Sequence, residues 1–318
     1  MAVISATLLF TGLAAAQNYP TKPMRMIVPY PPGGNVDISA RIVGPALTEL
    51  LGQTVIVDNR SGGGGNVGAG LVAKAMPDGY TLLVGSSGPL SVNPIVFKDT
   101  PYDSVKDFAP VSMVQVVPLV LTVSPKFAVG SVKELIDRAK SQPGKITIAS
   151  AGTGTTNHFA IELFSSMTGA KLLHIPYKGS GPALGELLGG QVNTMIDQLT
   201  SSMGFIKDGR LKVIAVTAAK RVAALPDVPT VAESGVPGYE ASTYLGVLAP
   251  AGTPRDIVMK INADVRKVIA EPAIQETFVK KQLYQPMDSS PEEFAAFIKS
   301  ETERWGKVIR EQNLQIGH

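Results

Sequence analysis

Residues 28–41 read Val-Pro-Tyr-Pro-Pro-Gly-Gly-Asn-Val-Asp-Ile-Ser-Ala-Arg, and this segment carries more information than any other part of the chain. An apolar strand is predicted just before it, and the prolines then stiffen the turn because each fixes φ and lacks an N–H. Gly33 and Gly34 allow the backbone to approach another group closely. A helix is predicted to begin near Asp37, and the free N–H groups of its first turn favour an anion. The alternative to an anion-binding site is an ordinary strand-to-helix connection, and this segment alone does not decide between the two.

Short apolar runs alternate with helical patterns along the rest of the chain. Strands are predicted at residues 24–28, 54–57, 81–84, 116–123, 146–149, 172–175, 194–196, 213–216 and 244–249. Helices are predicted at residues 38–51, 67–75, 132–140, 158–168, 182–188 and 202–207, followed by C-terminal helices. Strands that alternate with helices indicate βαβ units, so the predicted class is α/β with largely parallel sheets.

The runs at 116–123 and 244–249 stand where the chain would cross between two domains. Each is followed by a proline, and the strands predicted between them suffice for a complete sheet. We therefore expect a discontinuous first domain of residues 17–117 and 246–318, and a second domain of residues 118–245. Two α/β domains joined by two crossover strands predict a hinge around a ligand cleft.

Composition excludes several classes of protein. The chain has 318 residues, 44% hydrophobic and 17% charged, which indicates a globular protein. Its net charge is +3, and the basic residues are scattered, so nucleic acid is not an expected partner. The absence of cysteine excludes disulfides and thiol catalysis. The three histidines lie far apart in the sequence, so neither a metal nor another cofactor is predicted.

Residues 1–16 are predicted to be a signal peptide. They are apolar and uncharged and end in Ala14-Ala15-Ala16, as a cleavage site does. The basic segment that usually begins such a peptide is missing, so the start is either trimmed or lies upstream. An uncleaved N-terminal helix is the alternative. We expect the mature protein to be exported and soluble in the periplasm.

Polar, glycine-rich loops follow several of the predicted strands. The glycines at 62–65 lack the spacing of a nucleotide-binding loop and are expected to form a flexible rim. Ser86 and Ser87 form either an anion-binding turn or an ordinary polar turn. The loop at 150–158 combines hydroxyls, glycines and a helix start without an acid, which suits an anion, although Thr155 or Thr156 could simply cap the helix.

Ligands of open α/β sheets bind at the carboxyl ends of the strands, where these loops lie. Asp197 follows another strand and could either accept a hydrogen bond from a ligand or cap the next helix. His158 begins a helix and could equally be a packed, neutral histidine. No catalytic motif such as Gly-x-Ser-x-Gly or His-Glu-x-x-His is present, so an enzyme is not expected.

Several motifs together resemble one known family. They are Pro29-Tyr30-Pro31-Pro32-Gly33-Gly34 with Asp37 and Ala40-Arg41, Val57-Asp58-Asn59-Arg60 with Gly62 to Gly65, Ala75-Met76-Pro77-Asp78-Gly79-Tyr80, Gly154-Thr155 with His158, His174-Ile175-Pro176-Tyr177-Lys178-Gly179, and Pro226-Asp227-Val228-Pro229-Thr230. The chain thereby resembles, over about residues 19–315, the Bug receptors, the extracytoplasmic solute-binding proteins of tripartite tricarboxylate transporters.

The resemblance implies a monomeric periplasmic binding protein that closes around a small carboxylate and delivers it to membrane permease subunits. The ligand would be a dicarboxylate, tricarboxylate, acidic amino acid or aromatic acid. A receptor that docks to a signalling partner and an enzyme on the same fold are the alternatives.

The resemblance also implies a set of ligand-binding residues. The first loop would order water around the ligand, and the hydroxyls of the later loops would hold its carboxylate. Asp197 matches an acidic position near the pocket, whereas Asn35 replaces a smaller residue, so its amide would reach either the ligand or only the turn. The residues expected to bind are Tyr30, Pro32, Gly33, Gly34, Asn35, Ser86, Ser87, Thr153, Gly154, Thr155, Thr156, His158 and Asp197.

Overall fold

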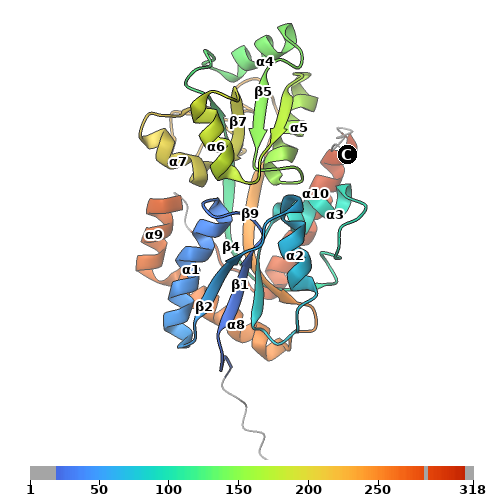
Figure 1. Ribbon diagram of the computed structural model, residues 1–318, viewed down its shortest axis with the longest axis vertical. Helices are drawn as coiled ribbons and strands as arrows, with labels where there is room; N and C mark the ends of the chain where they lie inside the picture. Colours follow the sequence, from blue (N-terminus) through green and yellow to red (C-terminus); the bar gives the residue numbers. More distant parts are fainter. Residues whose placement is uncertain (1–18, 283–285, 312–318) are drawn as a thin grey trace, which may run out of the picture.

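The computed structural model describes residues 19–282 and 286–311, and the structural statements below concern these residues. The predicted signal peptide lies outside them. Two α/β domains lie one above the other (Figure 1). Their strands form one continuous order, β2-β1-β3-β9-β4-β7-β5-β6, with β8 paired to β4. The predicted fold class is therefore confirmed.

The first domain, lower in Figure 1, is built on a sheet in which β1 lies between β2 and β3 and is parallel to both. Alternate residues of β1 face opposite sides of this sheet: Met26 and Val28 pack toward α1 and α8, and Ile27 packs toward α2 and α10. The strands are β1 (Met24–Val28), β2 (Val55–Asn59), β3 (Thr81–Ser86) and β9 (Ser242–Pro250). The helices are α1 (Asn35–Leu51), α2 (Asn66–Ala73), α3 (Asn93–Val96), α8 (Arg255–Ala270), α9 (Pro272–Gln282) and α10 (Pro291–Glu311).

The second domain repeats this plan. Its strand β5 lies between β6 and β7, parallel to both. Ile148 of β5 packs on the side of α4 and α5, and its neighbour Ala149 packs on the side of α6. The strands are β5 (Thr147–Ser150), β6 (Leu173–Pro176), β7 (Thr194–Gln198) and β8 (Lys212–Val216). The helices are α4 (Val132–Ser141), α5 (Thr156–Thr168), α6 (Ser180–Gly189) and α7 (Leu199–Lys207).

One long strand, β4 (Phe108–Val123), runs through both sheets. Its residues 108–118 pair with β9, and residues 119–123 pair with β7 and β8. The prediction of a strand only at 116–123 was therefore too short. Pro110 hides the first half from a sequence pattern, because proline is disfavoured inside a strand. Two register irregularities, at Pro110/Ser112 and at Met113/Gln115, accompany it. The domain boundaries near residues 117 and 245 remain predictions.

Helix α10 is a further connection between the domains. Phe294 and Ile298 of its first half belong to the core of the first domain. Trp305 of its second half is fully buried in the core of the second domain, where its ring centroid lies 6.1 Å from that of Phe159. In Figure 1 the helix accordingly runs from the lower domain up to the side of the upper one. A change in the angle between the domains would therefore have to be accommodated along α10.

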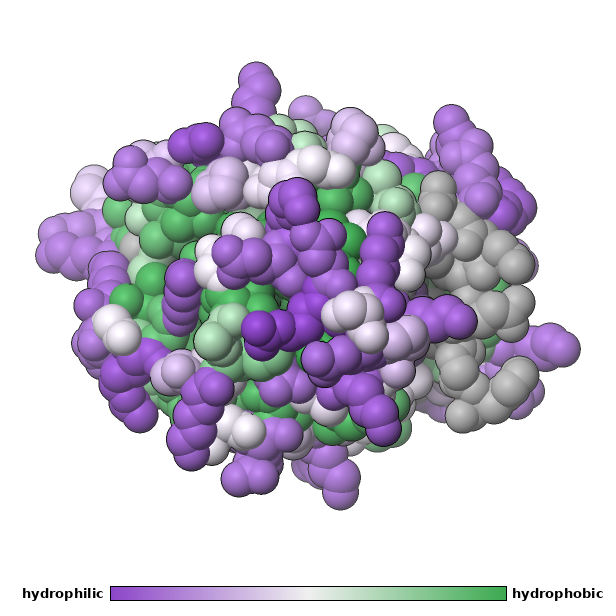
Figure 2. All heavy atoms as spheres, turned by 90° about the horizontal axis from the view of Figure 1, so that it is seen from above, coloured by the Kyte–Doolittle hydropathy of each residue, from purple (hydrophilic) through white to green (hydrophobic). Residues whose placement is uncertain are grey.

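Within the described ranges, every helix is too short or too polar to cross a membrane. Figure 2 looks down on the outer end of the second domain and shows hydrophilic side chains projecting over most of that face, with hydrophobic groups visible between them.

Candidate functional site

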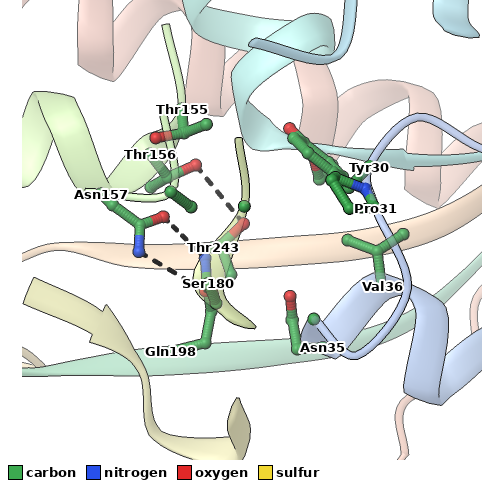
Figure 3. A pocket seen from close by; sticks show the side chains of 14 residues that line it. Tyr30, Pro31, Asn35, Val36, Thr155, Thr156, Asn157, Ser180, Gln198 and Thr243 are labelled. Atoms are coloured by element: carbon green, nitrogen blue, oxygen red, sulfur yellow. Dashed lines mark hydrogen bonds between the residues drawn. The ribbon is translucent and has the colours of Figure 1, made fainter. Parts of the chain in front are cut away.

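A cavity lies between the two domains at the carboxyl ends of their parallel strands (Figure 3). It encloses about 410 Å³ of space not filled by atoms, part of it open to solvent. Figure 3 shows Tyr30, Pro31 and Val36 on one wall and Thr155, Thr156 and Asn157 on the opposite wall. The lining residues are Tyr30, Pro31, Gly34, Asn35, Val36, Ser86, Ala151, Thr155, Thr156, Asn157, Gly179, Ser180, Gln198 and Thr243.

Four helices begin at this cavity. The N-terminal turns of α1, α5, α6 and α7 contribute Asn35, Thr156, Ser180 and the preceding Gln198 to its lining. The first N–H groups of a helix have no partner within the helix and carry the positive end of its dipole. None of the described residues that line the cavity is charged. The site therefore presents neutral donors and helix dipoles, which suits an anion that needs no cationic side chain.

Asp37 holds the turn at residues 29–34 rigidly. This buried carboxylate accepts hydrogen bonds from the N–H of Gly33 and from Asn59 and Arg41, at 2.9–3.0 Å. Burial alone would raise the pKa of Asp37, but these bonds, led by that from Arg41, bring it below its ordinary value. Because Asp37 folds back onto Gly33, α1 begins at Asn35 and not near Asp37 as predicted.

Tyr30 joins three loops of the first domain at the cavity wall. Its hydroxyl lies 3.0 Å from Oγ of Ser86 and donates to the carbonyl oxygen of Gly64 at 3.2 Å. The amide of Asn59 donates to the carbonyl oxygen of Tyr30 at 2.9 Å. Burial raises the pKa of Tyr30 to about 12, so the phenol stays protonated and remains a donor.

The opposite wall is ordered by a buried network around Asp197. Its Oδ1 accepts from Ser180 Oγ at 2.6 Å and from Asn157 Nδ2 at 3.1 Å, and its Oδ2 accepts from Ser202 Oγ at 3.1 Å. Gln198 Nε2 donates to Asn157 Oδ1 at 2.8 Å. Asp197 itself is fully buried and does not line the cavity. It orients Asn157 and Ser180, which do.

The residues expected to bind a ligand fall into three groups. Those that line the cavity are Tyr30, Gly34, Asn35, Ser86, Thr155 and Thr156. Thr153 lines an adjoining cavity, which shares Tyr30 and Thr155 with the first. Those outside both linings are Pro32 and Gly33, which shape the first turn, and Ser87, Gly154, His158 and Asp197, which lie behind the walls. Thr155 also caps α5, accepting from the N–H of His158 at 3.4 Å, as the capping alternative predicted.

Sequence reasoning missed eight lining residues, namely Pro31, Val36, Ala151, Asn157, Gly179, Ser180, Gln198 and Thr243. Most are sequence neighbours of residues that were named, so widening each loop by one or two positions would have found them. Thr243 could not have been found in this way, because it lies on strand β9 and not beside one of the named loop residues. It connects the walls: Thr156 donates to its hydroxyl at 3.5 Å, and Ser87 lies 2.7 Å from it.

The fold brings His158 and His174 together although they lie far apart in sequence. Their rings stack with centroids 4.1 Å apart, and Glu162 lies 3.6 Å from His158 Nε2. The three residues do not fit a metal as they stand. Stacked rings direct their nitrogens along parallel planes, and Nδ1 of His158 accepts from the N–H of Gly154 at 3.3 Å, which places the proton on Nε2. Burial, together with His158, lowers the pKa of His174 to about 3.

The two domains touch at the rim of the cavity through glycines. A Cβ added to Gly64 would lie 2.6 Å from the carbonyl oxygen of Thr153 in the second domain. A Cβ added to Gly179 would lie 3.1 Å from Cγ of Pro31 in the first domain. Side chains at these two positions would hold the domains apart. The glycine-rich stretch at 62–65 is therefore a contact surface between domains as well as a rim.

Two α/β domains that enclose a polar cavity and are joined by β4 and β9 define the class of periplasmic binding proteins. The model of the tripartite tricarboxylate transporter family receptor matches residues 39–314, and the chain belongs to this family. The resemblance to the Bug receptors is thereby confirmed.

The relatives agree over nearly the whole chain. Protein BugT of Bordetella pertussis is 40% identical over an alignment of 320 positions, which covers 99% of this chain and 98% of BugT. The structure of Rpa4515 from R. palustris with adipate is 36% identical, with a TM-score of 0.88 over 93% of this chain and 99% of that one. MatC (Rpa3494) from Rhodopseudomonas palustris with bound malate is 30% identical, with a TM-score of 0.87 over 92% of this chain and 100% of that one.

The burial of Asp197 predicts how stability depends on pH. Burial raises the pKa of Asp197 to about 6, against the opposing hydrogen bonds from Ser180, the backbone of Gln198, Ser202 and Asn157. In the unfolded chain the pKa is about 4, so the folded state holds the proton more tightly. The stability that protonation confers is fully present below about pH 4 and is lost as the pH rises through about 6, a change of about 3 kcal/mol.

The measurement is the free energy of unfolding in urea between pH 4 and pH 7 for the wild type and for Asp197→Asn. We expect the difference, wild type minus variant, to fall as the pH rises through this range. Asp208→Asn, at the exposed end of α7, controls for the loss of one negative charge. A difference that is constant or grows with pH contradicts the assignment.

Proposed function

We propose that this chain is an extracytoplasmic receptor that captures a small carboxylate in the cavity between its domains and delivers it to the permease of a tripartite tricarboxylate transporter. The observation that most supports the proposal is that four helix N-termini converge on one cavity. None of the described residues that line this cavity has a charged side chain. Family membership and the acids bound by two relatives, adipate and malate, support it. We also propose that the protein is located in the periplasm and that its two domains divide near residues 117 and 245.

The ligand's carboxylate is proposed to lie against the first turns of α5 and α6. Thr156 and Ser180 begin these helices, and Gly179 leaves the start of α6 without a side-chain cap. Hydrogen bonds from N–H groups to an ionised acceptor are stronger than those to a neutral one. Tyr30 and Ser86 complete the opposite wall. The roles of Thr153, Ser87 and Asp197 are then indirect, since they shape or support the lining.

The same arrangement supports binding without catalysis. The buried carboxylate Asp197 is occupied by Asn157, Ser180 and Ser202, and His158 and His174 stack on each other outside the lining. We therefore propose a receptor and not an enzyme.

A thermal-shift panel tests the proposed function. A ligand that binds only the folded state at a concentration of 100 Kd stabilises it by about 2.7 kcal/mol, which raises Tm by several degrees. We expect at least one acid among adipate, malate, succinate, citrate, aspartate and benzoate to do so. The carboxamide of that acid, with every carboxylate replaced by a neutral amide of nearly the same shape, should produce no shift. Stabilisation by a neutral sugar and by none of the acids would contradict the proposal.

The contact of Gly64 with the second domain at the rim of the cavity predicts that a side chain at this position weakens ligand binding. Gly64→Ala would place a Cβ 2.6 Å from the carbonyl oxygen of Thr153 and so oppose close approach of the domains. We expect affinity for the acid found in the panel to fall about tenfold, equivalent to about 1.4 kcal/mol. Isothermal titration calorimetry measures this change.

The same loop offers a matched control for this variant. Gly63 also has a left-handed φ, +55° against +63° for Gly64, but a Cβ there would meet only Cβ of Asn66 at 3.5 Å, an ordinary contact within the loop. Gly63→Ala therefore carries the same backbone strain without the contact between domains. Equal losses of affinity in the two variants would show that backbone strain, and not domain contact, is responsible.

A further inference from the structure

The amide of Asn35 is a buried donor without a partner. The residue is 3% exposed, and its Nδ2 makes no hydrogen bond within the described part of the chain. Buried polar side chains are nearly always hydrogen-bonded, so each exception needs an explanation. Asn35 lines the cavity, and Figure 3 shows its side chain rising from the start of α1 into that space.

Asn35 does not serve its own helix. The cap position of α1 is Gly34, and no side chain caps this end. The nearby carboxylate of Asp37 is already engaged by Gly33, Arg41 and Asn59. The carbonyl oxygen of Asn35 accepts from Ser39 Oγ at 2.8 Å, which fixes the backbone but leaves Nδ2 unused. The turn is therefore complete without the amide donor.

The cavity has donors on two sides. On the side of the second domain stand the first turns of α5 and α6, with Thr156 and Ser180. On the side of the first domain stands the start of α1, where the unused amide of Asn35 adds to the free backbone N–H groups. Figure 3 shows Asn35 and Thr156 entering the cavity from different domains. A ligand held at the far end by one carboxylate would therefore meet a second set of donors at α1.

We propose that Asn35 determines specificity by donating a hydrogen bond from Nδ2 to a second acceptor of the ligand, opposite the carboxylate held at α5 and α6. The preferred ligands are acids with an oxygen acceptor at both ends, dicarboxylates first among them. An acid with an apolar tail leaves the amide buried and unpaired. Sites built to hydrogen-bond a ligand reject analogues that lack the bonding group. The proposal rests on the proposed function, because it presumes the first carboxylate.

Matched pairs of acids test this role by isothermal titration calorimetry. Adipate and hexanoate differ in one terminal carboxylate, as do succinate and butyrate. Wild-type protein should bind the dicarboxylate of at least one pair at least tenfold more tightly than its partner. Asn35→Ala should reduce that preference at least tenfold, chiefly through weaker dicarboxylate binding. Asn35→Ser keeps a short donor at the helix start and provides a second variant should the first fold poorly.

Val36→Ala is the matched control, because Val36 lines the cavity beside Asn35 with an apolar side chain. It should weaken both acids of a pair by similar factors and leave their ratio unchanged. A wild-type protein that binds both acids equally, or only the monocarboxylate, overturns the role of Asn35 while the proposed function stands. So does a variant at Asn35 that weakens both acids alike. If no acid of the panel or of these pairs binds, the proposed function fails, and this inference fails with it.

Discussion

The unpaired N–H groups at the starts of α1, α5, α6 and α7 are the constraint on which the structure around the cavity depends. Each of these helices follows a strand that ends at the same cavity, so parallel strand order brings their positive ends together. Helix N-termini with unpaired N–H groups are stable only beside a hydrogen-bond acceptor or water. Short turns, small residues and neutral hydroxyls at the cavity leave room for one or the other. Asp37 and Asp197 stabilise the two walls from behind without facing the cavity.

The segments that connect the two domains determine how their walls come together around this cavity. β4 is continuous through both sheets, β9 pairs with its first half, and α10 places Phe294 in one core and Trp305 in the other. Contacts at the rim, Gly64 with Thr153 and Gly179 with Pro31, involve no polar side chain. The domains thus meet at the rim through backbone atoms and the ring of Pro31, and at the back through apolar packing.

The sequence predicted the layout well, because apolar runs and helical periodicity reflect burial. All the strands except β4 were placed to within two residues. Most helix starts were placed too late, α1 at Ile38 and α7 at Ser202, because the first turns at the cavity are polar and break the periodicity. For the same reason Asn157, Ser180 and Gln198 were missed. Asp197 and His158 were drawn into the predicted site by their chemistry, whereas only the packing shows that they lie behind it. The pairing of His158 with His174 is a long-range contact that no local pattern predicts.

The decisive experiment is a crystal structure of the protein with a bound dicarboxylate, adipate or whichever acid stabilises it. We expect one carboxylate within hydrogen-bond distance of the backbone N–H groups that begin α5 and α6, with no Lys or Arg side chain in contact with it. A carboxylate held by a cationic side chain, or bound away from the cavity between Tyr30 and Thr156, would contradict this expectation.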